Sequence, residues 1–167
     1  MKKNLYLICI MLCFTALFAA CGGGGGSSAS NTPTQATKAI VKLISTGTGT
    51  TICGIDVTVN LASGVTVRST NPPQVDSGVI TPSGVAGSGT IATAVYSAAT
   101  NTQPGKLRVL LANANGLTTG EFCTVNADIA SGATPASGEF SISNFSASDS
   151  SGNVISGISP TYSVVLQ

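Results

Sequence analysis

Few side chains in this chain could carry out acid–base chemistry. Histidine is absent from all 167 residues, which excludes a Ser-His-Asp or Cys-His arrangement and the usual zinc sites. A glycosidase needs two carboxyl groups about 5 to 10 Å apart in a cleft. Asp56 and Asp128 fall on the polar sides of two alternating segments, which is also the pattern of solubilising charges on a wet sheet face. We therefore expect that the protein is not an enzyme. The carboxylates are Asp56, Asp76, Glu121, Asp128, Glu139 and Asp149.

Oxygen ligands and a glycine occur together in the segment DSSGN, which runs from Asp149 to Asn153. A calcium loop of the EF-hand type needs regularly spaced acidic residues and a final glutamate, and this segment has neither. A hairpin turn is the prediction here. No metal site and no other cofactor are expected.

The first 20 residues predict a secretory signal. Lys2 and Lys3 form a basic start, and the apolar run that follows is too short for a transmembrane helix, which needs about 20 apolar residues. The sequence LFAAC, ending at Cys21, resembles the lipobox of bacterial lipoproteins, and the resemblance implies that Cys21 is acylated and becomes the new N-terminus. The alternative is an ordinary signal that leaves a free thiol at Cys21.

Five glycines follow Cys21 and open a segment rich in Gly, Ser, Thr, Asn and Pro. Such a segment cannot bury enough apolar surface to fold, so residues 21–37 predict a flexible tether that holds a domain on the order of 20 Å from a membrane. Lipoproteins of the enteric type carry a retention-signalling Asp after the acylated cysteine. This chain has Gly22 there, and the resemblance therefore implies an outer-membrane or cell-surface location.

Residues 38–167 have the size of one ordinary domain. Charged residues make up 8% of the chain and the formal net charge is +1, so the electrostatic signature of nucleic-acid binding is absent. Val, Ile and Thr are abundant, which favours a folded β-protein.

Apolar and polar residues alternate with the period of two that indicates half-buried strands. The alternation is strongest in residues 50–61, 105–113 and 120–129, and weaker in 39–45, 74–80, 90–97, 140–145 and 161–166. Turn clusters such as NPP, NANG and DSSGN separate these segments. Eight or nine short strands predict an all-β fold, an antiparallel two-sheet β-sandwich or jelly roll.

Three segments resemble cohesin modules and the wider superfamily of carbohydrate-binding sandwiches. They are GIDVTVNLASGVTV, GKLRVLLANANGLTTGEFCTVNADI and FSISNFSASDSSGNVIS. The resemblance implies a module that binds a protein partner through a sheet face, and in cohesins that partner is a dockerin, a small helical module. The superfamily also implies a polysaccharide-binding module as the alternative, although aromatic platforms are scarce here. A passive structural envelope lipoprotein is the third interpretation.

Short uncharged side chains on the outward sides of two strands are the candidate binding residues, because they hydrogen-bond without a large desolvation cost. They are Thr58, Asn60, Thr124 and Asn126. Plain solvated strand faces would show the same pattern.

Two cysteines, Cys53 and Cys123, remain after the signal and Cys21 are set aside. Alternation places both on inward faces, and an oxidising compartment favours a disulfide if their Cα atoms lie within about 7 Å. Alternation does not set strand order, so two separate buried thiols are the other expectation.

Overall fold

The computed structural model describes residues 35–49 and 51–167, which belong to one compact unit, Thr34–Gln167. The predicted signal, Cys21 and residues 22–34 of the predicted tether lie outside the described residues. The end of that predicted tether, residues 35–37, is attached to the domain. The Thr37 N–H donates to the carbonyl of Gln167 at 2.8 Å, and the Gln35 amide donates to the carbonyl of Ala133 at 2.7 Å.

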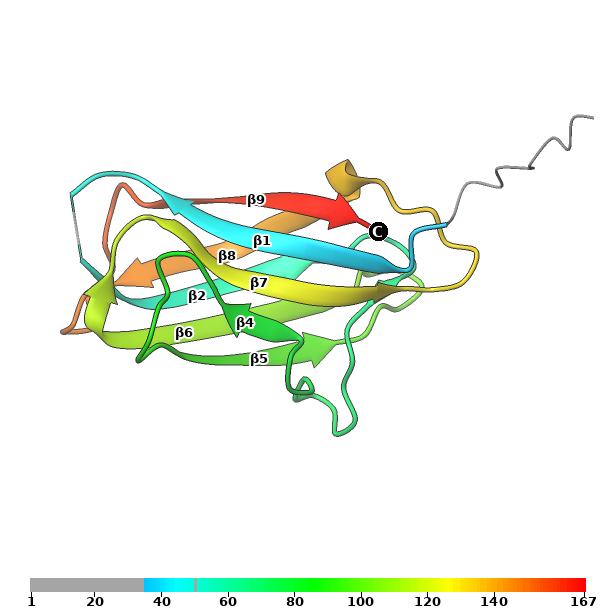
Figure 1. Cartoon of the computed structure of the whole chain (residues 1–167), viewed down its shortest axis with the longest axis horizontal. Helices are drawn as coiled ribbons and strands as arrows, with labels where there is room; N and C mark the ends of the chain where they lie inside the picture. Colours follow the sequence, from blue (N-terminus) through cyan, green and yellow to red (C-terminus); the bar gives the residue numbers. More distant parts are fainter. Residues whose placement is uncertain (1–34, 50) are drawn as a thin grey trace, which may run out of the picture. The chain divides into compact units, whose positions relative to one another are not determined.

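Nine strands and one short 3-10 helix make up the described chain (Figure 1). They are β1 (Lys38–Thr46), β2 (Ile52–Asn60), β3 (Val65–Thr66), β4 (Ile80–Pro82), β5 (Ile91–Ser97), β6 (Lys106–Leu117), β7 (Gly120–Ile129), η1 (Ser137–Glu139), β8 (Ser141–Ser148) and β9 (Ser159–Leu166). The described residues contain no helix that could span a membrane.

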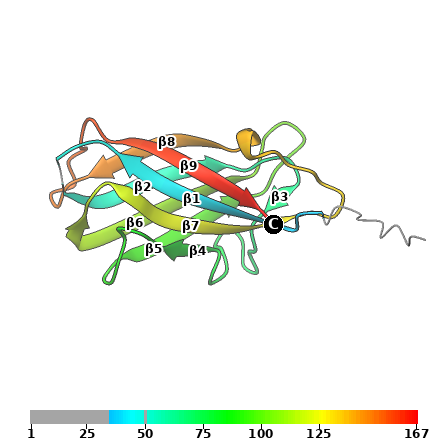
Figure 2. The same ribbon diagram turned by 45° about the horizontal axis from the view of Figure 1, so that its top comes forward.

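The strands form two antiparallel sheets packed face to face, as Figure 2 shows. Sheet A has the order β7-β1-β9, and the short strands β3 and β4 both pair with the other side of β7. Sheet B has the order β5-β6-β2-β8. The prediction of an all-β, two-sheet sandwich is confirmed.

The core lies between the sheets and is built from the apolar positions of the alternating segments. Val57 and Val59 of β2 face inward from sheet B, and Val125 and Ala127 of β7 face inward from sheet A, each at most 1% exposed. Phe122 and Phe140 are the largest fully buried side chains. Each fully buried side chain of Val, Leu or Phe size contributes about 1.5 to 3 kcal/mol to folding.

The prediction of a strand over residues 74–80 is wrong. Gln74 makes only isolated bridges to Asn71 and Val95, and β4 begins at Ile80. The side chain of Asp76 accepts hydrogen bonds from the N–H and hydroxyl of Thr70 at 2.7 and 2.9 Å. These bonds within the loop, followed by Gly78 at a φ of 82°, replace the strand ladder.

The cluster NANG, predicted to be a turn, is a bulge inside β6. Ile52 pairs with Leu117 and Gly54 pairs with Ala112, so the residues between Ala112 and Leu117 have no strand partner on β2. Gly116 has a φ of 78°, and a Cβ there would come 1.9 Å from the Cγ2 of Thr51. Turn residues therefore bend a continuous strand instead of ending it.

Candidate functional site: the outer face of sheet B

The outward side chains of sheet B form four rows across β5, β6, β2 and β8, with a register shift on β8 between Ser143 and Ser146, and we call this surface the sheet B face. The pairing register sets the rows, because directly opposed residues on a pleated sheet share a face. The rows are Ser97–Lys106–Asn60–Ser141, Val95–Arg108–Thr58–Ser143, Thr93–Leu110–Asp56–Ser146 and Ile91–Ala112–Gly54–Ser148.

An ion pair occupies the middle of the sheet B face. The Nε of Arg108 donates to Oδ1 of Asp56 at 3.0 Å, and its terminal nitrogen donates to Oδ2 at 2.5 Å. This two-point hydrogen bonding lowers the pKa of Asp56 and raises that of Arg108. Both groups are thus charged at neutral pH, and because they neutralise each other the middle of the face has little net charge.

A hollow of about 590 Å³ opens at one end of the sheet B face. Its floor consists of small side chains, since Gly54, Ala112 and Ser148 are neighbours in one row. A Cβ on Gly54 would come 2.5 Å from the Ser148 hydroxyl oxygen, so only glycine fits that position without a shift. Ile91 lines the same hollow and is 73% exposed.

The bulge in β6 builds one wall of this hollow. Asn113 is 5% exposed, and its side-chain nitrogen donates to the Thr90 hydroxyl at 2.8 Å while its oxygen accepts the N–H of Asn115 at 2.9 Å. These two bonds hold the unpaired residues of the bulge in one conformation. The sequence pattern did not lead to a prediction of the hollow. The signal that could have indicated it is the NANG cluster, because turn residues that follow an alternating segment can form a bulge.

The four predicted binding residues do not lie on one face, so the prediction that they form a single binding site is wrong. Thr58 and Asn60 belong to the sheet B face, but Thr58 is only 7% exposed, and the Asn60 amide donates to the Ser141 hydroxyl at 2.9 Å. Thr124 and Asn126 lie on the opposite surface of the sandwich, because β7 belongs to sheet A.

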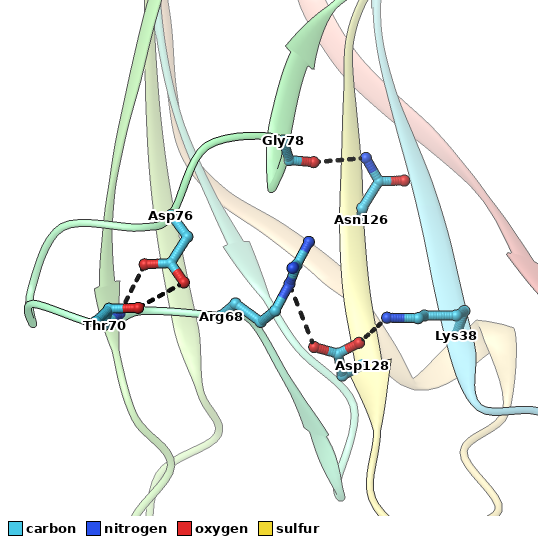
Figure 3. Close-up of polar contacts among 7 residues, drawn as sticks. All are labelled: Lys38, Arg68, Thr70, Asp76, Gly78, Asn126 and Asp128. Atoms are coloured by element: carbon cyan, nitrogen blue, oxygen red, sulfur yellow. Dashed lines mark hydrogen bonds and ion pairs between the residues drawn. The ribbon is translucent and has the colours of Figure 1, made fainter.

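Thr124 and Asn126 hold the chain that leads into and out of β4. The Asn126 amide donates to the carbonyl of Gly78 at 2.8 Å (Figure 3), and the Thr124 hydroxyl donates to that of Ser83 at 3.1 Å. The Ser83 hydroxyl and then Lys42 lower the pKa of nearby Glu121. These side chains position β4 against β7, which is a structural role.

Asp56 and Asp128, the two carboxylates that could have formed a glycosidase pair, also lie on opposite surfaces. Asp56 pairs with Arg108, and Asp128 pairs with Lys38 and, at 4.0 Å, with Arg68 (Figure 3). The sandwich core separates the two groups, so they cannot act on one bond.

Cys53 and Cys123 are both free thiols, and the predicted disulfide between them is wrong. Cys123 faces the core from sheet A and is fully buried, and burial raises the pKa of its thiol to about 12. Cys53 belongs to sheet B. A register shift between Ile52 and Gly54 interrupts the alternation there, so the Cys53 side chain does not face the core. It is half-buried and lines the hollow.

The DSSGN segment forms the predicted turn after β8. The Asp149 N–H donates to the carbonyl of Asn153 at 3.0 Å, and the Asp149 carboxylate accepts the N–H groups of Ser151 and Asn153. Hydrogen bonds lower the pKa of Asp149, and the bond from the Asn153 side chain has the largest effect. No cluster of three or more His, Cys, Asp or Glu that could hold a metal occurs in residues 35–49 and 51–167.

Comparison with known proteins found no protein-family model, no curated protein and no solved structure that matches this chain. The resemblance to cohesin modules therefore stays a prediction made from the sequence.

Proposed function

We propose that the protein is a membrane-anchored binding module of a bacterial cell surface that engages a protein partner through the sheet B face. The hollow beside Ile91 carries this proposal. A mainly apolar hollow of about 590 Å³, with Asp149 in its lining and an exposed aliphatic side chain at its margin, can accept an apolar side chain of a partner and cover Ile91 at the same time. Protein interfaces concentrate their binding energy in such pockets.

The surroundings of the hollow support a protein ligand. Ile91, Val95 and Leu110 are the large apolar side chains of the sheet B face, and the ion pair of Arg108 with Asp56 lies between them and β8. Apolar side chains beside polar and charged groups are the usual composition of a protein interface. The cohesin resemblance of the sequence implies a dockerin-like helical module or another envelope protein as the kind of partner.

A polysaccharide is the second candidate ligand, because of the serines on β8. Ser141, Ser143, Ser146 and Ser148 stand in successive rows beside β2, and hydroxyl groups in such a column can hydrogen-bond a glycan chain. None of the four rows contains an aromatic side chain, so stacking on a pyranose ring would not contribute.

The experiment uses the fragment from Thr34 to Gln167, which contains the whole described core. Immobilised fragment is incubated with native envelope extract, and Ala112→Arg, which fills the hollow from an exposed position, is compared with wild type. Thr81→Arg is the matched control, because Thr81 is exposed on sheet A.

We expect a partner that wild type and Thr81→Arg retain and that Ala112→Arg loses. A partner retained equally by all three would contradict the role of the hollow. Reproducible hits on a glycan array that Ala112→Arg leaves unchanged, with no protein partner, would favour the β8 serines and a polysaccharide ligand. No partner and no glycan would favour a passive envelope component.

A further inference from the structure

Most sheet edges in the described structure are protected against pairing with another strand. The Tyr96 N–H of β5 donates to the carbonyl of Pro73 at 2.7 Å, so a loop covers that edge. On β8, the Ile155 N–H donates to the carbonyl of Ala147 at 2.8 Å, and Asn144 interrupts the strand at a φ of 51°. The strands β3 and β4 have only two and three residues. Short, bulged or covered edges are the usual means by which proteins avoid edge-to-edge association.

The edge strand β9 has no such irregularity and no loop bonded to its outer backbone groups; η1 lies near it, and there the Tyr162 hydroxyl donates to the carbonyl of Phe140. It runs for 8 residues with the sequence SPTYSVVL, which contains no charged side chain and no glycine. Its one proline, Pro160, stands near the start of the strand. Its pairing with β1 has no register shift over its whole length. A regular, uncharged edge of this kind is a template for another strand.

The backbone groups on the free side of β9 follow from the pairing with β1. Lys38 and Gln167 exchange hydrogen bonds of 2.7 and 2.9 Å, and hydrogen-bonded pairs alternate along an antiparallel ladder. Val165 and Ser163 therefore bond to β1, whereas the N–H and C=O groups of Tyr162, Val164 and Leu166 point away from it. No turn, loop or cap hydrogen bond within the described residues uses these groups.

We propose that β9 pairs antiparallel with β9 of a second copy of this chain, centred on Val164. In this register Val164 faces its own counterpart and Tyr162 faces Leu166, so every free N–H of one copy meets a free C=O of the other. Pro160, which has no N–H, falls beyond the paired segment. The two-fold arrangement uses the same edge of both copies, so it closes as a dimer.

The side chains of β9 are compatible with a second copy. On the outer surface Ser163 would face Val165, which is 51% exposed, and no like charges are opposed. On the inner side the half-buried Val164 and Tyr162 would lose further exposure to water. The contact is small, at the low end of specific interfaces, so we expect a dimer that forms in the range of about 10 µM to 1 mM.

The first test measures the mass of the Thr34–Gln167 fragment by sedimentation as its concentration rises. A reducing agent is present so that Cys53 cannot form an intermolecular disulfide. Val164→Pro removes an N–H that faces away from β1 and leaves the ladder intact, so this variant should remain monomeric. Val164→Thr keeps the N–H and the side-chain shape, and it should dimerise like wild type.

The second test examines the register through paired charges. Ser163→Glu together with Val165→Glu places carboxylates opposite each other across the dimer and should abolish it. Ser163→Glu with Val165→Lys places opposite charges there and should preserve it. Glutamate is chosen at 163 because Lys42 is its neighbour on β1.

A wild-type fragment that stays monomeric up to 1 mM would overturn the proposal. So would a dimer that forms equally well in Val164→Pro and in both charge variants, because such a dimer would use another surface. If Val164→Pro does not fold, the two charge variants, which are on the exposed side of the strand, still decide the matter. Amide protection of Tyr162, Val164 and Leu166 against hydrogen exchange should rise with concentration in wild type and in the Ser163→Glu, Val165→Lys variant, and should not rise in the Ser163→Glu, Val165→Glu variant.

Discussion

Gly54 of β2 and Ser148 of β8 approach each other so closely that a Cβ on Gly54 would come 2.5 Å from the Ser148 hydroxyl oxygen. Ala112 is the partner of Gly54 on the other side, in β6. This sequence of small residues across three strands lowers the surface of sheet B and creates the hollow. The candidate binding site therefore depends on a small residue at one position in each of three strands.

Gly54→Ala should destabilise the domain by about 1 to 3 kcal/mol, the usual cost of excess volume at a packed position. Ser148→Ala removes the hydroxyl oxygen that the new methyl group would meet. The double variant should therefore recover most of the lost stability, which a double-mutant cycle of urea unfolding curves would measure. Additive losses would show that Ser148 is not the group that excludes a side chain at 54.

Asn113→Ala should destabilise the bulge of β6 by about 1 to 3 kcal/mol, because it removes the two hydrogen bonds that the buried Asn113 side chain makes, one with the Thr90 hydroxyl and one with the N–H of Asn115. Thr90→Ala is the control, since it removes only one of the two hydrogen bonds and should cost less. Urea unfolding measures the stability, and faster hydrogen exchange at Asn115 would report local loosening. Equal effects of the two variants would contradict a role of Asn113 in holding the bulge.

The two thiols should differ in reactivity in the folded protein. Cys53 lines the hollow and should react with a thiol reagent at pH 8, whereas the buried Cys123 should react only after unfolding. Mass spectrometry of the labelled Thr34–Gln167 fragment would count one label in the native state and two in denaturant, without any reductant. If neither thiol is labelled in denaturant, Cys53 and Cys123 are joined by the disulfide that the structure contradicts.

Cys123 should also make the stability of the domain fall at alkaline pH. Burial raises the pKa of its thiol from 9.0 to about 12 in the folded state, so the folded state holds this proton more tightly than the unfolded state does. The resulting stabilisation is complete below pH 9 and is lost as the pH rises from about 9 to about 12.

The comparison with Cys123→Ala isolates the contribution of this thiol from every other effect of alkaline pH on the domain. The difference in unfolding free energy between wild type and Cys123→Ala should shrink as the pH rises from 9 toward 12. A difference that is constant over this range would mean that the Cys123 thiol does not titrate on unfolding.

Cys21→Ser should release the full-length protein from the membrane fraction, because the lipobox resemblance makes Cys21 the acylated residue. Inhibition of the lipoprotein signal peptidase should likewise accumulate an unprocessed precursor of wild type. Fractionation followed by immunoblotting measures both results. Retention of Cys21→Ser in membranes after a high-salt wash would mean that another part of the chain holds the protein there.

The sequence alone was sufficient for the fold class and for the inward side chains of the strong strands. Val57, Val59, Val125 and Ala127 could be assigned to the core because alternation with a period of two separates the faces of any strand that is half-buried. The basic start, the short apolar run and Cys21 likewise allow an anchor to be predicted without a structure, since these features act as a linear signal.

Only the tertiary structure decided which strands share a surface. Thr58 and Thr124 have the same local pattern, yet β2 and β7 belong to different sheets, and alternation carries no information about strand order. Alternation with its neighbours predicted that the Cys53 side chain faces the core. The structure differs, because a bulge changes the register and a shift of one residue moves a side chain to the other face. The hollow depends on Gly54, Ala112 and Ser148, which are far apart in the sequence and meet only through long-range pairing.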